Sequence, residues 1–263
     1  MRIQWFEFQT PLPLIWRVTL GICAWCVFIS IWYVAASSNL APERLFPSPA
    51  NVIEALIRLL TEDNFIIDIW ASIQRIFISF SIATFIALPL GLAMGAFNSI
   101  HAFFNPLTSA FRYLPAPSFI PLLLMWLGTG NEQKIALLVI GVVWFLITLI
   151  ADNTTKVRAD FIDTARTLGA DRRTILWRVI FRSALPDYVT TCRQMLAVSW
   201  TYLVIAEIVA STDGIGAMMM RAKRFVHVDE IMAGILVIGI LGLVFDGIFR
   251  LGHRLSFPYL YNT

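Results

Sequence analysis

Charged residues are scarce in this sequence. They make up 14% of its 263 residues, against roughly 25% in soluble domains, whereas hydrophobic residues make up 58% and the mean hydropathy is +0.74. A soluble helical protein of this length would need far more polar surface, so the sequence predicts a polytopic membrane protein. The net charge of +3 is modest and gives no indication of a nucleic-acid partner.

Cysteine and histidine are also rare, with three of each. Cys23 and Cys26 have CxxC spacing, but no histidine or further cysteine lies nearby, so we expect small apolar residues in a membrane helix and no metal or redox site. His101, His227 and His253 are scattered, which argues against a membrane enzyme. The sequence also lacks a G-x-x-x-x-G-K-[ST] stretch, so any ATP chemistry must belong to a partner.

Six hydrophobic stretches can cross a membrane, since a bilayer core takes about 20 apolar residues per helix. They cover residues 14–36, 73–97, 107–127, 134–151, 187–210 and 231–251. Pro115, Pro117 and Pro121 interrupt the third stretch, where we expect a break beside a protein-lined path, with a plain kink as the alternative. The sequence thus predicts an all-α integral membrane protein with about six transmembrane helices in one domain, residues 1–263.

A short amphipathic helix is expected between the first two stretches. Pro47 and Pro49 mark an extended turn, and Asn51 can cap the helix that follows. Its apolar residues recur at helical spacing and are Val52, Ile53, Leu56, Ile57 and Leu60. This helix is expected on the membrane surface or against the bundle.

Basic residues predict the orientation of the chain. The connection 152–186 is rich in them: Lys156, Arg158, Arg166, Arg172, Arg173, Arg178 and Arg182. The two ends of the chain add Arg2, Arg17, Arg250 and Arg254. An even number of spans puts these regions on one side, which the positive-inside rule identifies as cytoplasmic. We therefore expect both termini in the cytoplasm.

The segment 158–186 is too regular for a simple connection. Asp160 can cap a first helical turn that Gly169 ends, and Asp171 can cap a second helix that Pro186 stops before the next span. The apolar residues of the two pieces are Phe161, Ile162, Ala165, Leu168, Ile175, Leu176, Val179 and Ile180. Two short helices at a bend form a compact knob, which we expect to dock a cytosolic partner and to transmit rigid-body motion.

This segment resembles the EAA loop of ABC importer permeases, of general form E-A-A-x3-G-x9-I-x-L-P. The positions on the motif are Asp163, Thr164, Ala165, Gly169 and Val179. Ala165 and Gly169 match strictly, and Phe181 and Arg182 stand where Leu and Pro would be. The stretches LFPSPANVIEAL, FRYLPAPSFIPLLLMWLGTGNEQKI and AVSWTYLVIAEIVASTDGIG are similar to the nitrate/sulfonate/taurine/bicarbonate permeases, over about residues 45–250.

The resemblance implies a type I ABC importer (MetI-like) permease fold in the bacterial inner membrane. Such a subunit moves a small anion of the nitrate, sulfonate, taurine or bicarbonate type by alternating access. Its partners would be two cytosolic ABC ATPase subunits with their ATP and Mg²⁺, an external substrate-binding protein, a second and usually identical permease copy, and membrane lipid; no cofactor is expected in this chain. The ATPase-coupling residues would be Asp163, Thr164, Ala165, Leu168, Gly169, Ala170 and Asp171.

Polar and helix-breaking residues inside the spans are candidates for the translocation path, because an ionisable residue in a membrane is costly. The candidates are Arg112, Pro115, Pro117, Arg193, Ser199, Trp200, Leu203 and Glu207. Trp200, Leu203 and Glu207 share one helix face, which we expect to line the path. The alternative is that Glu207 and Arg112 or Arg193 form pairs inside the bundle or make hydrogen bonds to broken backbone.

The last external connection holds a methionine run at residues 218–220, followed by Arg221, Lys223 and Arg224. These residues are expected to contact a binding protein or to attract an anion from outside; a solvated loop without a special role is the alternative.

Two other functions stay open. An importer of the same class could carry a neutral or zwitterionic vitamin precursor such as a pyrimidine. A secondary transporter or channel without an ATPase would need a coupling-ion site, often with paired carboxylates or duplicated broken helices. The sequence offers one acidic residue deep in an expected span, Glu207, and no clear inverted repeat.

Overall fold

The structure is a computed structural model that describes residues 12–38, 42 and 44–261. Arg2, which was used for the orientation, lies outside the described residues. In chain order the α-helices are α1 Leu14–Ser37, α2 Pro49–Thr61, α3 Phe65–Ala96, α4 Asn98–Tyr113, α5 Ile120–Leu127, α6 Asn131–Thr155, α7 Ala159–Thr167, α8 Arg172–Thr174, α9 Phe181–Ala210, α10 Ile215–Arg224 and α11 Val228–Ser256. Short 3₁₀ turns occupy Ala116–Phe119 and Pro258–Leu260, and a π-helical turn, Ile175–Ile180, joins α8 to α9.

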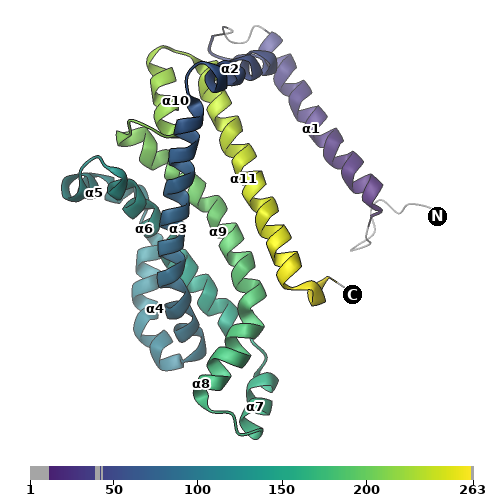
Figure 1. The fold of residues 1–263 in the computed structure, drawn as a ribbon, viewed down its shortest axis with the longest axis vertical. Coiled ribbons are helices and arrows are strands. Elements are labelled where there is room, and N and C mark those ends of the chain that lie inside the picture. Colours follow the sequence, from purple (N-terminus) through teal and green to yellow (C-terminus); the bar gives the residue numbers. More distant parts are fainter. Residues whose placement is uncertain (1–11, 39–41, 43, 262–263) are drawn as a thin grey trace.

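Most of these helices run along the long axis of the molecule (Figure 1). In the described part of the chain, α1, α3, α6, the continuous stretch Arg172–Val209 and α11 are each long and apolar enough to cross a membrane. The bent pair α4–α5 makes a sixth span if it is counted as one. This confirms the prediction of an all-α membrane protein with about six spans.

The core of the bundle lies where α3 packs against α6 and α6 packs against α9. Glycine permits the close approach of α3 to α6, because a Cβ at Gly91 would lie 2.8 Å from the carbonyl oxygen of Ile147. A Cβ at Gly95 would overlap Thr154 in the same way. The GxxxG stretch therefore serves this packing within one chain.

The third span is broken by a bend of 86° between α4 and the 3₁₀ turn that leads into α5. Leu114 and Pro115 have extended backbone angles. Leu114 precedes a proline, and such a residue is kept out of the helical region. Pro121 lies in the first turn of α5, where a proline is tolerated. The predicted break is therefore confirmed, although Pro121 begins a helix and does not interrupt one.

Two predicted boundaries in the first third of the chain are wrong. α3 begins at Phe65, well before the expected residue 73, because Asp68, Ser72 and Arg75 are buried inside the helix bundle. α2 is capped by Ser48 and not by Asn51, whose backbone N–H donates to the Ser48 hydroxyl at 3.3 Å.

The apolar stripe of α2 is only half buried. Val52 and Leu59 pack against the bundle, whereas Ile53 and Ile57 remain more than half exposed. α2 lies across one end of the bundle, where it packs chiefly against α11 (Figure 1). α1 contributes no buried residue and stands apart from the other helices; the Trp32 Nε1–H donates to the carbonyl of Pro47 at 3.1 Å and ties its end to the start of α2.

Candidate functional site

The coupling segment, residues 158–186, projects from the end of the bundle opposite to α2 and α10 (Figure 1). α7 ends in a Schellman motif, in which the N–H of Ala170 donates to Ala165 O at 3.0 Å and that of Gly169 donates to Arg166 O at 2.9 Å. Gly169 has a φ of +78°, a conformation that favours glycine. The prediction that Gly169 ends the first helix is confirmed.

The tip of the coupling segment is open. Leu168, next to Gly169, is 82% exposed, and Phe161 and Trp177 are also exposed. A Cβ added at Gly169 would meet no atom within 4 Å. Glycine is therefore required there by the backbone conformation and not by lack of space.

The second half of the coupling segment is anchored to α3. Asp171 caps it and accepts a hydrogen bond from the Thr174 N–H at 3.2 Å; hydrogen bonds from Thr174 lower the pKa of the Asp171 carboxyl. In the π-helical turn, residues five apart come to one side of the helix. Ile175 and Ile180 are therefore both buried in a small apolar cluster with Leu92 of α3.

Two details of this segment differ from the prediction. Arg158, and not Asp160, occupies the cap position of α7, and Asp160 lies in the first turn with an exposed ion pair of 2.7 Å to Arg158. Pro186 does not stop the second helix, because it lies within the continuous stretch Arg172–Val209. Its carbonyl oxygen accepts a hydrogen bond from the Thr190 hydroxyl at 3.0 Å.

A second candidate site lies at the opposite end of the bundle. We call it the polar cluster: Asp68, Ser72 and Arg75 of α3, Glu207 of α9, and Asp213. The Arg75 side chain is 3% exposed and that of Glu207 is 0% exposed, and Arg75 Nη1 lies 2.6 Å from Glu207 Oε1. Ser72 Oγ donates to the same carboxylate at 2.8 Å. A buried ion pair needs such additional hydrogen bonds to offset its desolvation.

Arg75 uses its remaining donors to reach two further elements. Nη2 lies 2.6 Å from Asp213 Oδ1, and Nε donates to Asn131 Oδ1 at 2.9 Å. Burial opposes ionisation of Asp213, but the hydrogen bond and charge of Arg75 outweigh it and lower the pKa of this carboxyl. One guanidinium thus joins α3 to α9, to the start of α6 and to the connection before α10.

The polar cluster also caps α10. The N–H groups of Gly214, Ile215 and Gly216 donate to Asp68 Oδ1 at 2.8 Å, to Ser72 Oγ at 2.9 Å and to Glu207 Oε2 at 2.9 Å, respectively. The first N–H groups of a helix have no partner within the helix and carry partial positive charge. Two carboxylates and one hydroxyl from α3 and α9 accept these hydrogen bonds, so that α10 is fixed to both helices.

The other path candidates lie elsewhere. Arg193 pairs with Asp246 of α11 at 3.4 Å, and Arg112 places its guanidinium 5.6 Å from the ring centre of Tyr113. Glu207 therefore pairs with Arg75, and the suggested pairing with Arg112 or Arg193 is wrong. Ser199, Trp200 and Leu203 are buried inside the chain together with Glu207. Pro115 and Pro117 lie at the bend of the third span.

Sequence reasoning missed the partners of Glu207. Asp68 was placed outside the expected spans, and Arg75, inside the expected stretch 73–97, was not recognised as a candidate, although the two sit seven residues apart in a largely apolar run, a spacing that puts both on one helix face. Asp246, inside α11, was missed as well. These residues show that Glu207 is not the one acidic group deep in the helices.

Comparison with known proteins identifies the family. Residues 76–257 match the family described as binding-protein-dependent transport system inner membrane component. The chain belongs to this family. It is a permease, a transport subunit of the ABC importer class, and ATP hydrolysis belongs to a partner subunit.

Two relatives and one solved structure show which known permeases this chain resembles. It is 32% identical over 250 residues to the taurine transport system permease protein TauC of Escherichia coli (strain K12), covering 93% of this chain and 91% of the relative. It is 25% identical over 252 residues to the nitrate import permease protein NrtB of Synechocystis sp., covering 90% of each chain. A structure of the MetNI methionine ABC transporter in an inward-facing conformation matches with a TM-score of 0.59 at 18% identity, covering 76% of this chain and 97% of that one. This likeness confirms the predicted permease fold.

Proposed function

We propose that this permease forms the translocation path of an ATP-driven importer for a small sulfonate of the taurine type. The observation that carries the proposal is the 32% identity to a taurine permease over 93% of the chain. The similarity to a nitrate permease supports small anions as the wider substrate class. Two ATPase subunits and an external binding protein complete the importer.

The coupling segment is the docking site of the ATPase subunit in this proposal. The exposed Leu168 and the capped turn at Gly169 give it a protruding tip, and the packing of Ile175 on Leu92 ties that tip to α3. A tip that is both protruding and anchored can transmit a push to the bundle. The basic residues of this end favour the cytoplasmic side, with both termini there.

A second copy of this chain completes the path in this proposal. The backbone at Leu114 and Pro115 is not helical, and both residues are exposed in the single chain. Non-helical backbone at membrane depth is tolerated only against protein or a water-filled cavity. A homodimer whose copies meet near this bend satisfies that requirement and puts Arg112, Pro115 and Pro117 beside the path. Ser199, Trp200, Leu203 and Glu207 would then support the path from within the protomer, with Arg193 at the α11 contact.

The test is uptake of radiolabelled taurine by cells that lack other taurine importers and express the complete importer. Saturable, ATP-dependent uptake that excess ethanesulfonate inhibits is expected. The Arg112→Gln variant should reduce this uptake while the ATPase subunit still copurifies, and Arg17→Gln, in the first turn of α1, is the matched control. Absence of taurine uptake by an assembled importer that hydrolyses ATP would refute the substrate assignment.

A further inference from the structure

The turn between α10 and α11 holds a strained residue at the end of the bundle opposite to the coupling segment (Figure 1). Val226 has a φ of +60°. For a β-branched side chain this is an outlier that costs on the order of 1–3 kcal/mol. The turn is a Schellman motif, since the N–H of Val226 donates to Lys223 O at 3.1 Å and that of His227 donates to Ala222 O at 3.0 Å. Glycine or asparagine usually occupies this position.

Two apolar side chains at this strained turn are exposed on the outside of the chain. Phe225 is 76% exposed and Val226 is 56% exposed. Neither residue belongs to an apolar core cluster of the described chain, so packing within the chain does not explain why the turn carries valine. Local strain is a feature of ligand clamps and binding sites, where the surroundings hold it in place.

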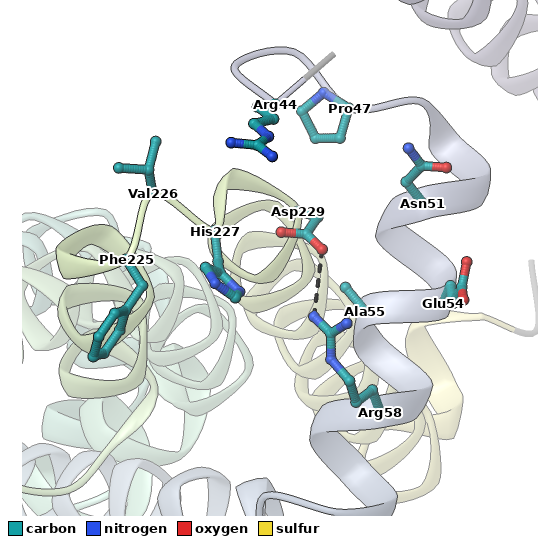
Figure 2. Close-up of a pocket in the computed structure, with 10 residues that line it drawn as sticks. All are labelled: Arg44, Pro47, Asn51, Glu54, Ala55, Arg58, Phe225, Val226, His227 and Asp229. Carbon is teal, nitrogen blue, oxygen red and sulfur yellow. Dashed lines mark hydrogen bonds and ion pairs between the residues drawn. The ribbon is translucent and has the colours of Figure 1, made fainter.

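A pocket of about 790 Å³ opens beside this turn, between α2 and the start of α11. Figure 2 shows Phe225, Val226 and His227 on one side of it, and Arg58 and Glu54 of α2 on the other. Arg58, on the α2 side of the pocket, is paired with the start of α11: it lies 3.5 Å from Asp229, which also lines the pocket, and 2.9 Å from Glu230. These ion pairs join α2 to the start of α11 beside the pocket.

The rim around the turn is positively charged. Arg44 borders the pocket, and Lys223 and Arg224 form the last turn of α10 directly before Phe225. All three side chains are exposed, and none makes an ion pair within the described part of the chain. Glu54 and Asp229 are the acidic residues that line the same pocket, and Asp229 is paired with Arg58. An exposed aromatic residue surrounded by unpaired cations is suited to a protein partner with an apolar recess and acidic edges.

We infer that the docking surface, Arg44, Lys223, Arg224, Phe225 and Val226 together with the pocket beside them, receives an acidic-edged lobe of the external binding protein. This inference rests on the proposed function, because the family is binding-protein-dependent and the ATPase is assigned to the opposite end. Phe225 inserts into the lobe as an anchor. Val226 holds Phe225 outward, and the three cations fix the orientation of the lobe.

A photo-crosslinking amino acid at position 225 of the complete importer, in intact cells, tests the partner directly. The expected product joins this chain to a soluble ligand-binding protein, identified by mass spectrometry, and the yield should fall when Lys223 and Arg224 are both changed to glutamine. The same probe at Phe85, exposed in the middle of α3, is the control and should give no such product. A product with lipid, a product with a second copy of this chain, or no product at position 225 would each overturn the inference.

A kinetic experiment separates docking from folding. In proteoliposomes that contain the complete importer, Phe225→Ser should raise the concentration of that crosslinked binding protein needed for half-maximal uptake by about ten-fold or more, the effect of losing an interface anchor, and should leave the maximal rate largely intact. Ile57→Ser, a matched change on the exposed face of α2, should leave both values unchanged. If Phe225→Ser lowers the maximal rate but leaves the half-maximal concentration unchanged, docking at this surface is contradicted. If the unchanged permease does not copurify with an ATPase subunit, the proposed function itself is contradicted.

Discussion

The two ends of the bundle stop a helix with the same hydrogen-bond motif but with different residues. At the coupling segment the left-handed position is Gly169, which adopts φ +78° without strain. At the α10–α11 turn it is Val226, which adopts φ +60° at a cost. The first end keeps its knob with apolar packing on α3, and the other end keeps α10 with buried charges. The comparison shows that one local motif can be tuned for rigidity at one site and for an exposed side chain at another.

The largest effect is expected from the buried charges that hold α10. Arg75→Met leaves Glu207 buried without its cation and should destabilise the protein by about 3–5 kcal/mol, which corresponds to a fall in Tm on the order of 10 °C. Thermal unfolding of the purified complex in detergent measures it. Adding Glu207→Gln to Arg75→Met should recover part of the loss, because the uncompensated charge is gone. Direct coupling of the pair would be contradicted if the double variant lost as much stability as Arg75→Met alone, or as much as the two single variants together.

The next effect concerns the glycine stop. Gly169→Val forces a β-branched residue into the left-handed region, which costs on the order of 1–3 kcal/mol at the tip, and should abolish uptake while the chain still inserts in the membrane. Gly169→Asn is the matched control, since asparagine tolerates this conformation, and it should retain most of the uptake. Because a side chain at this position meets no other atom, equal loss in both variants would indicate that the partner requires space there and not a particular turn.

The reverse change at the other end should raise stability. Val226→Gly removes the strain and should stabilise the fold by up to about 1 kcal/mol, an increase in Tm of a few degrees, while uptake falls. The experiment measures both thermal unfolding and uptake, and the expected result is a higher Tm together with lower uptake. A Tm that falls in Val226→Gly would show that valine serves the fold.

The smallest effect is a dependence on pH through Asp213. Its folded pKa is lowered by Arg75, so its contribution to stability is present above the unfolded pKa of about 3.9 and is lost as the pH falls through the lower, folded value. Because the side chain is partly exposed, the contribution is below about 1 kcal/mol. Asp213→Asn should lower Tm slightly at pH 7 and reduce the difference from the parent below about pH 4. A constant difference across that range would contradict the ion pair.

Hydropathy and proline were sufficient to predict the spans and the break near Pro115, because both signals are local. Gly169 and Asp171 were predicted as a helix stop and a cap for the same reason. The polar cluster could not be predicted this way. Arg75 and Glu207 are 132 residues apart, and only the packing of α3 against α9 brings them together. A long-range pairing of buried charges leaves no periodic signal in a single sequence.

One local prediction failed, and one turn was not predicted at all. Pro186 was expected to end a helix, yet α9 continues through it from Phe181 to Ala210. Val226 gave no turn signal at all, because a β-branched residue is the last that propensity would place at φ +60°. Val226, which departs from this conformational preference, is also exposed and belongs to the proposed docking surface.

The unbroken helix from Arg172 to Val209 has a mechanical consequence. Its 38 residues make a rod about 57 Å long at about 1.5 Å per residue. The rod begins in the segment assigned to the ATPase and carries Glu207, a cap of α10, near its far end. A tilt of about 5° around the near end would displace the far end by about 5 Å at that length. In the proposed importer, this helix would act as a lever: a push by the ATPase on its near end would move the end that holds α10, and the movement would grow with the length of the helix.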